Sequence, residues 1–112
     1  MANIYEDGEI IIEGLIREIN ACYYEGKPEG INHYKERFSN WLNILCDNTD
    51  GLLYNDLFYI FENEILPLIP KLISLEHGKE RVDIFETIKA KLEDILFTLE
   101  CLEDESLLDY EC

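Results

Sequence analysis

Apolar side chains recur at three- and four-residue spacing in four successive segments, a spacing typical of one face of a helix. Mainly charged and amide residues stand between them, so each segment also has a polar side. No alternating, strand-like pattern competes, which predicts an all-α protein. The three clearest stripes are Ile12, Leu15, Ile16, Ile19 and Tyr23 in the first segment, Ile31, Tyr34, Phe38, Trp41 and Leu45 in the second, and Phe85, Ile88, Leu92, Ile95, Leu99 and Leu102 in the fourth.

The third segment, residues 52–77, is apolar around most of its circumference. Such a pattern predicts the central helix of the fold, packed by several neighbours. Because Pro67 and Pro70 lack a backbone N–H, we expect this helix to be kinked or broken near them. The pair His77-Gly78 is typical of a helix end and predicts Gly78 in the left-handed conformation.

The connections between the segments are short. Residues 24–30 contain two glycines and a proline, and residues 47–51 read Asp-Asn-Thr-Asp-Gly, which is rich in turn and cap residues. Short connections favour antiparallel neighbours, so we predict a single domain over residues 1–112, folded as an antiparallel four-helix bundle. Residues 103–112 carry five acids and no base, and we expect this acidic tail to fray or to fold its Leu107, Leu108 and Tyr110 back onto the bundle.

Charge restricts the class of partner. Of 112 residues, 25 are Asp or Glu and nine are Lys or Arg, which gives a formal net charge of −16. The excess argues against direct binding of nucleic acid, which depends on positive side chains that replace counterions. It disfavours anionic membrane surfaces for the same reason. A basic protein partner would make use of the charge, although solubility alone is a sufficient reason for it.

The cysteines indicate a reducing compartment. They form no Cys-x-x-Cys pair, and none has zinc-site spacing to a histidine. Acidic residues at positions 6, 7 and 9 interrupt the N-terminus before any apolar run, so we expect no secretory signal. We therefore predict a cytoplasmic protein with free thiols, in which Cys22, Cys46 and Cys101 take core or boundary positions and Cys112 is exposed.

Patterns that would carry catalysis or metal binding are missing from the sequence. His33 and His77 have no nucleophile motif beside them, and we expect each to be exposed or to cap a helix end. The Glu-x-x-His motif of di-metal bundles fails, because Gly30 and Ser74 stand three residues before the histidines. No calcium-loop or phosphate-binding glycine pattern fits either. The sequence predicts neither an enzyme nor a metal or cofactor site.

An interaction surface is the remaining candidate. The stretch from Phe38 to Pro70 contains no Lys or Arg, and its five acids are interleaved with aromatic residues. Aromatic side chains often anchor protein interfaces, and acids steer a basic partner toward them. The alternative is that these aromatics simply fill the core. We predict a partner-binding surface that consists of Tyr54, Asp56, Tyr59, Glu62, Asn63 and Glu64.

Small size, acidic charge, a helical fold and such a surface are the properties expected of an inhibitor that blocks a basic enzyme. The leading prediction is an immunity protein or antitoxin that blocks a nuclease-type toxin, because a nuclease site is positively charged to hold its substrate. The first alternative is a phage-type nucleic-acid mimic that blocks a defence protein, which requires acids along one face at phosphate-like spacing. The second is a helical adaptor subunit that forms a homodimer through apolar surface.

Overall fold

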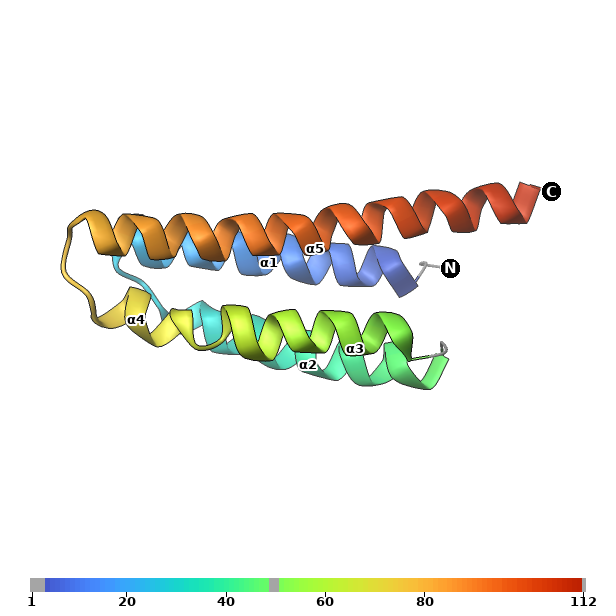
Figure 1. The fold of residues 1–112 in the computed structure, drawn as a ribbon, viewed down its shortest axis with the longest axis horizontal. Coiled ribbons are helices and arrows are strands. Elements are labelled where there is room, and N and C mark those ends of the chain that lie inside the picture. Colours follow the sequence, from blue (N-terminus) through green and yellow to red (C-terminus); the bar gives the residue numbers. More distant parts are fainter. Residues whose placement is uncertain (1–3, 49–50, 112) are drawn as a thin grey trace.

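The computed structural model describes residues 4–48 and 51–111, with side chains as far as Asp104. These residues are helical almost throughout, and no strand occurs among them (Figure 1). The predicted all-α class is therefore confirmed. The elements are α1 (Ile4–Glu25), α2 (Glu29–Asn48), α3 (Leu52–Tyr59), the π-helical segment η1 (Ile60–Ile65), α4 (Leu68–Ser74) and α5 (Lys79–Glu111).

The most enclosed helix is α1. It lies beside α5 along the molecule and also packs against α2 and α4 (Figure 1). Eight of the 22 residues of α1 are buried, whereas residues 52–77, all of which the structure describes, contain five buried residues: Leu57, Phe61, Ile65, Ile69 and Leu72. The prediction that residues 52–77 form the central helix is therefore wrong. A segment can be apolar on most sides and still lie at the edge, as the 70 % exposure of Leu52 demonstrates.

Two glycines let α1 and α2 approach closely. A Cβ atom at Gly8 would stand 2.5 Å from the ring of Trp41, and a Cβ at Gly14 would overlap the ring of Tyr34. The indole N–H of Trp41 donates a hydrogen bond to the carbonyl oxygen of Ile4 at 2.9 Å. The aromatic rings of α2 therefore occupy space that side chains on α1 would otherwise fill. This close packing offsets the poor helix propensity of the two glycines.

The apolar stripe of α5 faces the interior, as its spacing predicts. Ile88, Leu92, Ile95 and Leu99 are each at most 1 % exposed. With 33 residues, α5 should measure about 50 Å, close to the 52 Å length of the molecule. Its C-terminal end projects beyond the N-terminal end of α1 (Figure 1).

The acidic tail is helical in backbone as far as Glu111, because α5 continues to that residue. The predicted return of Leu107, Leu108 and Tyr110 to the bundle concerns side chains outside the described part of the chain. The predicted exposure of Cys112 also lies outside the described residues.

The third segment is interrupted. Regular α-helix ends at Tyr59, and the N–H of Leu66 bonds to the carbonyl of Phe61 at 2.9 Å, a five-residue step typical of π-helix. Pro67 precedes α4, and Pro70 lies in the first turn of α4, where a missing N–H is tolerated. The helix then ends at Ser74. Gly78 does not adopt a positive φ, so its predicted left-handed conformation is wrong.

Arg81 ties the start of α5 to the end of α1. It is 7 % exposed, and its guanidinium donates to the carbonyl oxygens of Tyr23 at 3.1 Å and Cys22 at 3.3 Å. It also lies over the Tyr23 ring, 4.6 Å from the centroid. The last turn of a helix has carbonyls without intrahelical donors and a partial negative charge. Arg81 supplies a donor to the Tyr23 carbonyl and a positive charge beside the negative end of α1, while the Cys22 carbonyl also accepts from the backbone N–H of Gly26 at 3.2 Å.

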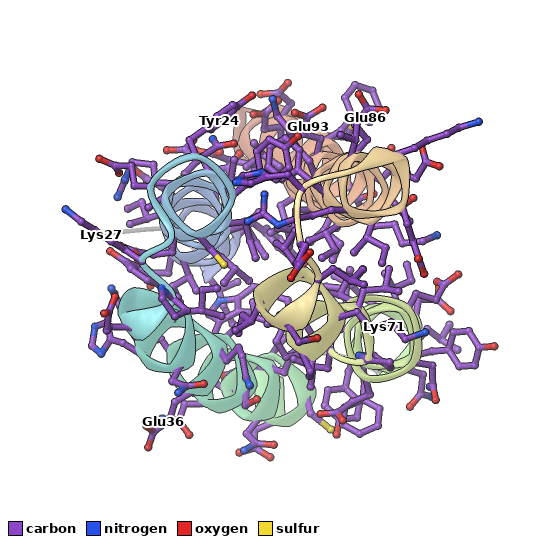
Figure 2. The ribbon with its side chains drawn as sticks, turned by 90° about the vertical axis from the view of Figure 1, so that its left-hand side faces the viewer. Tyr24, Lys27, Glu36, Lys71, Glu86 and Glu93 are labelled. Carbon is purple, nitrogen blue, oxygen red and sulfur yellow. The ribbon has the colours of Figure 1, made fainter. Side chains whose placement is uncertain are left out.

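Apart from Arg81 and Glu9, no charged side chain that the structure describes is buried. Seen from the end that carries α4, Lys27, Glu36, Lys71, Glu86 and Glu93 point away from the interior (Figure 2). This arrangement keeps the many carboxylates in water, where their repulsion is screened.

We predict that truncating the middle of the α5 stripe destabilises the fold. Leu92→Ala or Ile95→Ala should lower the free energy of unfolding by about 2–5 kcal/mol, because each leaves a cavity in a packed interior. Urea titration measures the loss. Phe97→Ala on the same helix is the control, because Phe97 is 67 % exposed and its truncation should change little. Equal effects of the three changes would contradict the packing.

We further predict that Arg81→Ala destabilises the protein by about 1.5–3 kcal/mol, because it leaves carbonyls at the end of α1 without their charged donor. The control is Arg37→Ala: Arg37 is exposed and lies over the Tyr34 ring at 5.5 Å. Arg81→Lys should recover only part of the loss, since one ammonium cannot reproduce the guanidinium fork. An Arg81→Ala protein as stable as the Arg37→Ala protein would refute the capping role.

Candidate partner-binding surface

The six predicted surface residues stand on α3 and η1, and we call them the α3–η1 ridge: Tyr54, Asp56, Tyr59, Glu62, Asn63 and Glu64. Asp56, Tyr59 and Asn63 are exposed, and the other three are half-buried. The Asn63 amide donates to the carbonyl oxygen of Tyr59 at 3.2 Å. Leu57, Phe61 and Ile65 are buried beneath the ridge and hold it in place.

One side of the ridge faces α2. Tyr54 and Glu62 line a hollow of about 220 Å³ together with Phe58 and, from α2, Ser39 and Asn43. The rings of Tyr54 and Phe58 stack with centroids 5.5 Å apart. Positions 54, 58 and 62 repeat every four residues, so they follow one line along the helix.

The other side of the ridge faces α5. Asp56 and Tyr59 line a groove of about 340 Å³, with Leu53 and Ile60 beside them and Thr98 from α5 opposite. Further along, the Lys91 ammonium of α5 contacts the Glu64 carboxylate at 3.2 Å. The predicted set is therefore divided. Asp56, Tyr59 and Glu64 lie toward α5, and Tyr54 and Glu62 lie toward α2.

The ion pair changes the electrostatics expected of the ridge. Glu64 lies in a stretch without basic residues, yet the fold brings Lys91 to it from 27 positions along the chain. Both side chains are about one third exposed, so the pair contributes little to stability. It does reduce the charge that Glu64 presents to a partner.

Sequence reasoning missed several exposed apolar residues near the ridge. Leu52 and Phe58 are 70 % and 41 % exposed, and Phe97 on α5 is 67 % exposed. Leu52 and Phe58 lie in the segment that is apolar on most sides, so their spacing did not distinguish them from core residues, whereas Phe97 lies off the predicted stripe of its helix. For Thr98, which completes the groove, the sequence holds no signal, because the residue joins the site only through the packing of α5.

A second hollow of about 340 Å³ lies between α1 and α2. Ile10 and Ile44, each about half exposed, flank Trp41, and Asp7 and Arg37 stand at its margin. The hollow therefore has an apolar base and one charge of each sign, in contrast to the acidic ridge.

The described cysteines and histidines do not come together in a metal site. Cys22 is buried, and burial raises the pKa of its thiol although Arg81 acts in the opposite direction. Cys46 and Cys101 are free and exposed, so their predicted core or boundary positions are wrong. Both histidines are exposed. Among the described residues, no group of three or more His, Cys, Asp and Glu is arranged to hold a metal ion.

Glu9 on α1 is the unusual carboxyl of the fold, since it is only 8 % exposed. Its pKa is raised from the ordinary 4.5 to about 7, first by burial and then by a hydrogen bond with Glu103 of α5 and by repulsion from Glu103, Glu100 and Glu13. Two carboxyl groups can share a hydrogen bond only if one carries a proton. The end of the α1–α5 contact therefore holds a proton near neutral pH.

No family model matches the chain, and comparisons with curated proteins and with solved structures find no significant match. Among the described helices, none is long and apolar enough to cross a membrane.

We predict that replacing Glu9 by Gln stabilises the protein at alkaline pH. The pKa of Glu9 in the folded state, about 7, exceeds the ordinary 4.5, so its protonation favours folding below about pH 4.5 and that contribution is lost as the pH rises through 7. At pH 8, Glu9→Gln should raise the free energy of unfolding by about 1–3 kcal/mol. The gain should shrink by pH 5.5. The control, Glu36→Gln, changes an exposed carboxyl on α2 that is not among the groups that raise the pKa of Glu9. A gain that is independent of pH would contradict the assignment.

Proposed function

We propose that the protein binds a basic protein partner through the α3–η1 ridge and inhibits it. The observation that carries this proposal is the exposure of Tyr59, at 60 %, next to the exposed Asp56 on a helix without any basic residue. An exposed aromatic provides an anchor, and nearby acids provide attraction over a distance. Buried Leu57 and Phe61 fix the backbone beneath, and rigid presentation lowers the entropy lost on binding.

The class that best suits this chemistry is an immunity protein or antitoxin of the cytoplasm that blocks a nuclease-type toxin. A nuclease must expose positive charge to hold its substrate, and an acidic plug gains both affinity and association rate from that charge. This proposal requires no catalytic group, cofactor or metal on the chain.

Two alternatives have different support. A phage-type nucleic-acid mimic needs acids spaced along one face, and the division of the ridge together with the Glu64–Lys91 pair argues against it. A helical adaptor that forms a homodimer is favoured by the half-exposed Ile10 and Ile44 at the α1–α2 hollow. The ridge remains the better candidate, because its exposed side chains are both aromatic and acidic.

For the arrangement of the helices, we propose an antiparallel four-helix bundle in which α3, η1 and α4 act together as one third helix, kinked near Pro67 and Pro70. The π-helical step before Pro67 supports this arrangement, because such segments are common where helices bend. The whole chain then forms one domain, with the acidic tail on the last helix.

We predict that binding of the partner, captured from source cells, depends on both the aromatic anchor Tyr59 and the acids Asp56 and Glu62. Tyr59→Ala should raise the dissociation rate about tenfold or more, because a desolvated aromatic anchor is lost. The pair Asp56→Lys/Glu62→Lys should mainly slow association, and high salt should reduce that difference by screening. Glu64 is left unchanged because its replacement would also free Lys91.

Binding kinetics at low and high salt test the prediction. The matched control is Glu36→Lys/Glu86→Lys, which makes the same change of charge at exposed sites on α2 and α5. Folded ridge variants that bind like the parent would overturn the proposal. A control pair that slows association as much as the ridge pair would show that net charge alone attracts the partner.

A further inference from the structure

Two segments without basic residues meet at one end of the molecule. The first extends from Phe38 to Pro70, and the second from Leu92 to the end of the sequence. In the fold, the groove between α3 and α5 lies between them, because Leu53, Asp56 and Tyr59 of the first line it opposite Thr98 of the second. No Lys or Arg is among its lining residues. The groove is therefore a place where negative potential is concentrated and a cation is attracted.

The groove exists because α3 and α5 do not pack together along their length. The contacts of α5 are with α1, α4 and η1, whereas α3 packs against α2 and continues into η1. The change from α-helix to π-helix at Ile60 separates a part that touches α5 from a part that stands away from it. The gap is about 340 Å³, which suits one long side chain and not a whole helix.

Its lining has two kinds of chemistry. The half-buried Leu53 and Ile60 present aliphatic surface above the buried Leu57, and Asp56 and Tyr59 add a carboxylate and an aromatic ring. Asp56 and Tyr59 are three residues apart on one helix, so they are neighbours on its surface. A ligand that suits this lining has an apolar stem and a flat cationic head.

We propose that the α3–α5 groove is the seat of an arginine side chain from the basic partner. The methylene stem of the arginine packs on the leucines and Ile60, and its guanidinium pairs with the Asp56 carboxylate and lies against the Tyr59 ring. Arginine suits this site better than lysine, because its planar head both forms two parallel hydrogen bonds and stacks on an aromatic ring. This inference rests on the proposed function and names the partner's chemistry.

A second copy of the chain is a poorer occupant. Each copy carries a net charge of −16, so two copies repel one another at the most acidic end. Of the three arginines, Arg81 is engaged at the end of α1, and the exposed Arg17 and Arg37 belong to a chain whose net negative charge opposes its approach to the groove. The α1–α2 hollow, with Asp7 and Arg37 at its margin, lacks the excess of acid that would select a cation.

The test uses three acetylated and amidated nine-residue Lys/Gly peptides, identical except for a central arginine, lysine or citrulline. Backbone amide shifts of the full-length protein are followed by NMR during titration. We expect the arginine peptide to bind best, with the largest shifts at residues 53–60 and 94–98. The lysine peptide should bind about threefold more weakly or worse, and the neutral citrulline peptide should bind more weakly still.

Matched variants locate the contact. Asp56→Asn should weaken binding of the arginine peptide about threefold to tenfold. Glu62→Gln removes the same charge from the other side of the ridge and should change binding less than twofold if the groove is the seat. Thermal unfolding of both variants checks that they are folded.

The outcomes separate this inference from the proposed function. If the peptides bind at the α2-facing hollow, and Glu62→Gln weakens their binding more than Asp56→Asn does, the groove assignment is wrong. The ridge would then remain the binding surface. If arginine and lysine peptides bind equally, the guanidinium is not recognised and the assignment is also wrong. If the captured partner ignores the ridge variants while the peptides bind in the groove, the proposed function fails separately.

Discussion

The structure depends on keeping α1 enclosed between α5 and α2. Its apolar face packs on the α5 stripe, and its glycines admit the aromatic rings of α2. Enclosing a helix also encloses its ends, where backbone carbonyls have no partner within the helix. Arg81 resolves that difficulty at the C-terminal end, because it supplies donors and positive charge from the first turns of α5. The same residue sets the register of α5 against α1.

At the opposite end of this helix pair, the fold tolerates a buried acid. Glu9 and Glu103 approach each other without a basic partner among the groups that shift the pKa of Glu9. A shared proton makes the approach possible, at the expense of a dependence on pH. The two ends of the α1–α5 contact therefore differ in kind. At one end a buried guanidinium caps α1, and at the other a buried carboxyl, that of Glu9, has its pKa raised to about 7 by burial and by the neighbouring Glu103.

The proposed binding surface lies on an outer helix, which is less constrained than α1. α3 buries little beyond Leu57, which leaves its aromatic and acidic residues available to solvent. The π-helical step that follows shifts the direction of side chains and separates the ridge into a side facing α2 and a side facing α5. The two sides differ in their environment: one has the stacked rings of Tyr54 and Phe58, and the other is a groove lined by Asp56 and Tyr59.

The sequence by itself determined the helical class, the buried stripe of α5 and the exposure of Asp56 and Tyr59, because periodicity and charge are local properties of the chain. Tertiary structure decided which helix is central, that Lys91 meets Glu64, and that Thr98 completes a groove with α3. An apolar residue shows that burial is favourable but not which neighbour will bury it. That choice is made by packing among residues distant in the chain, and periodicity carries no information about it.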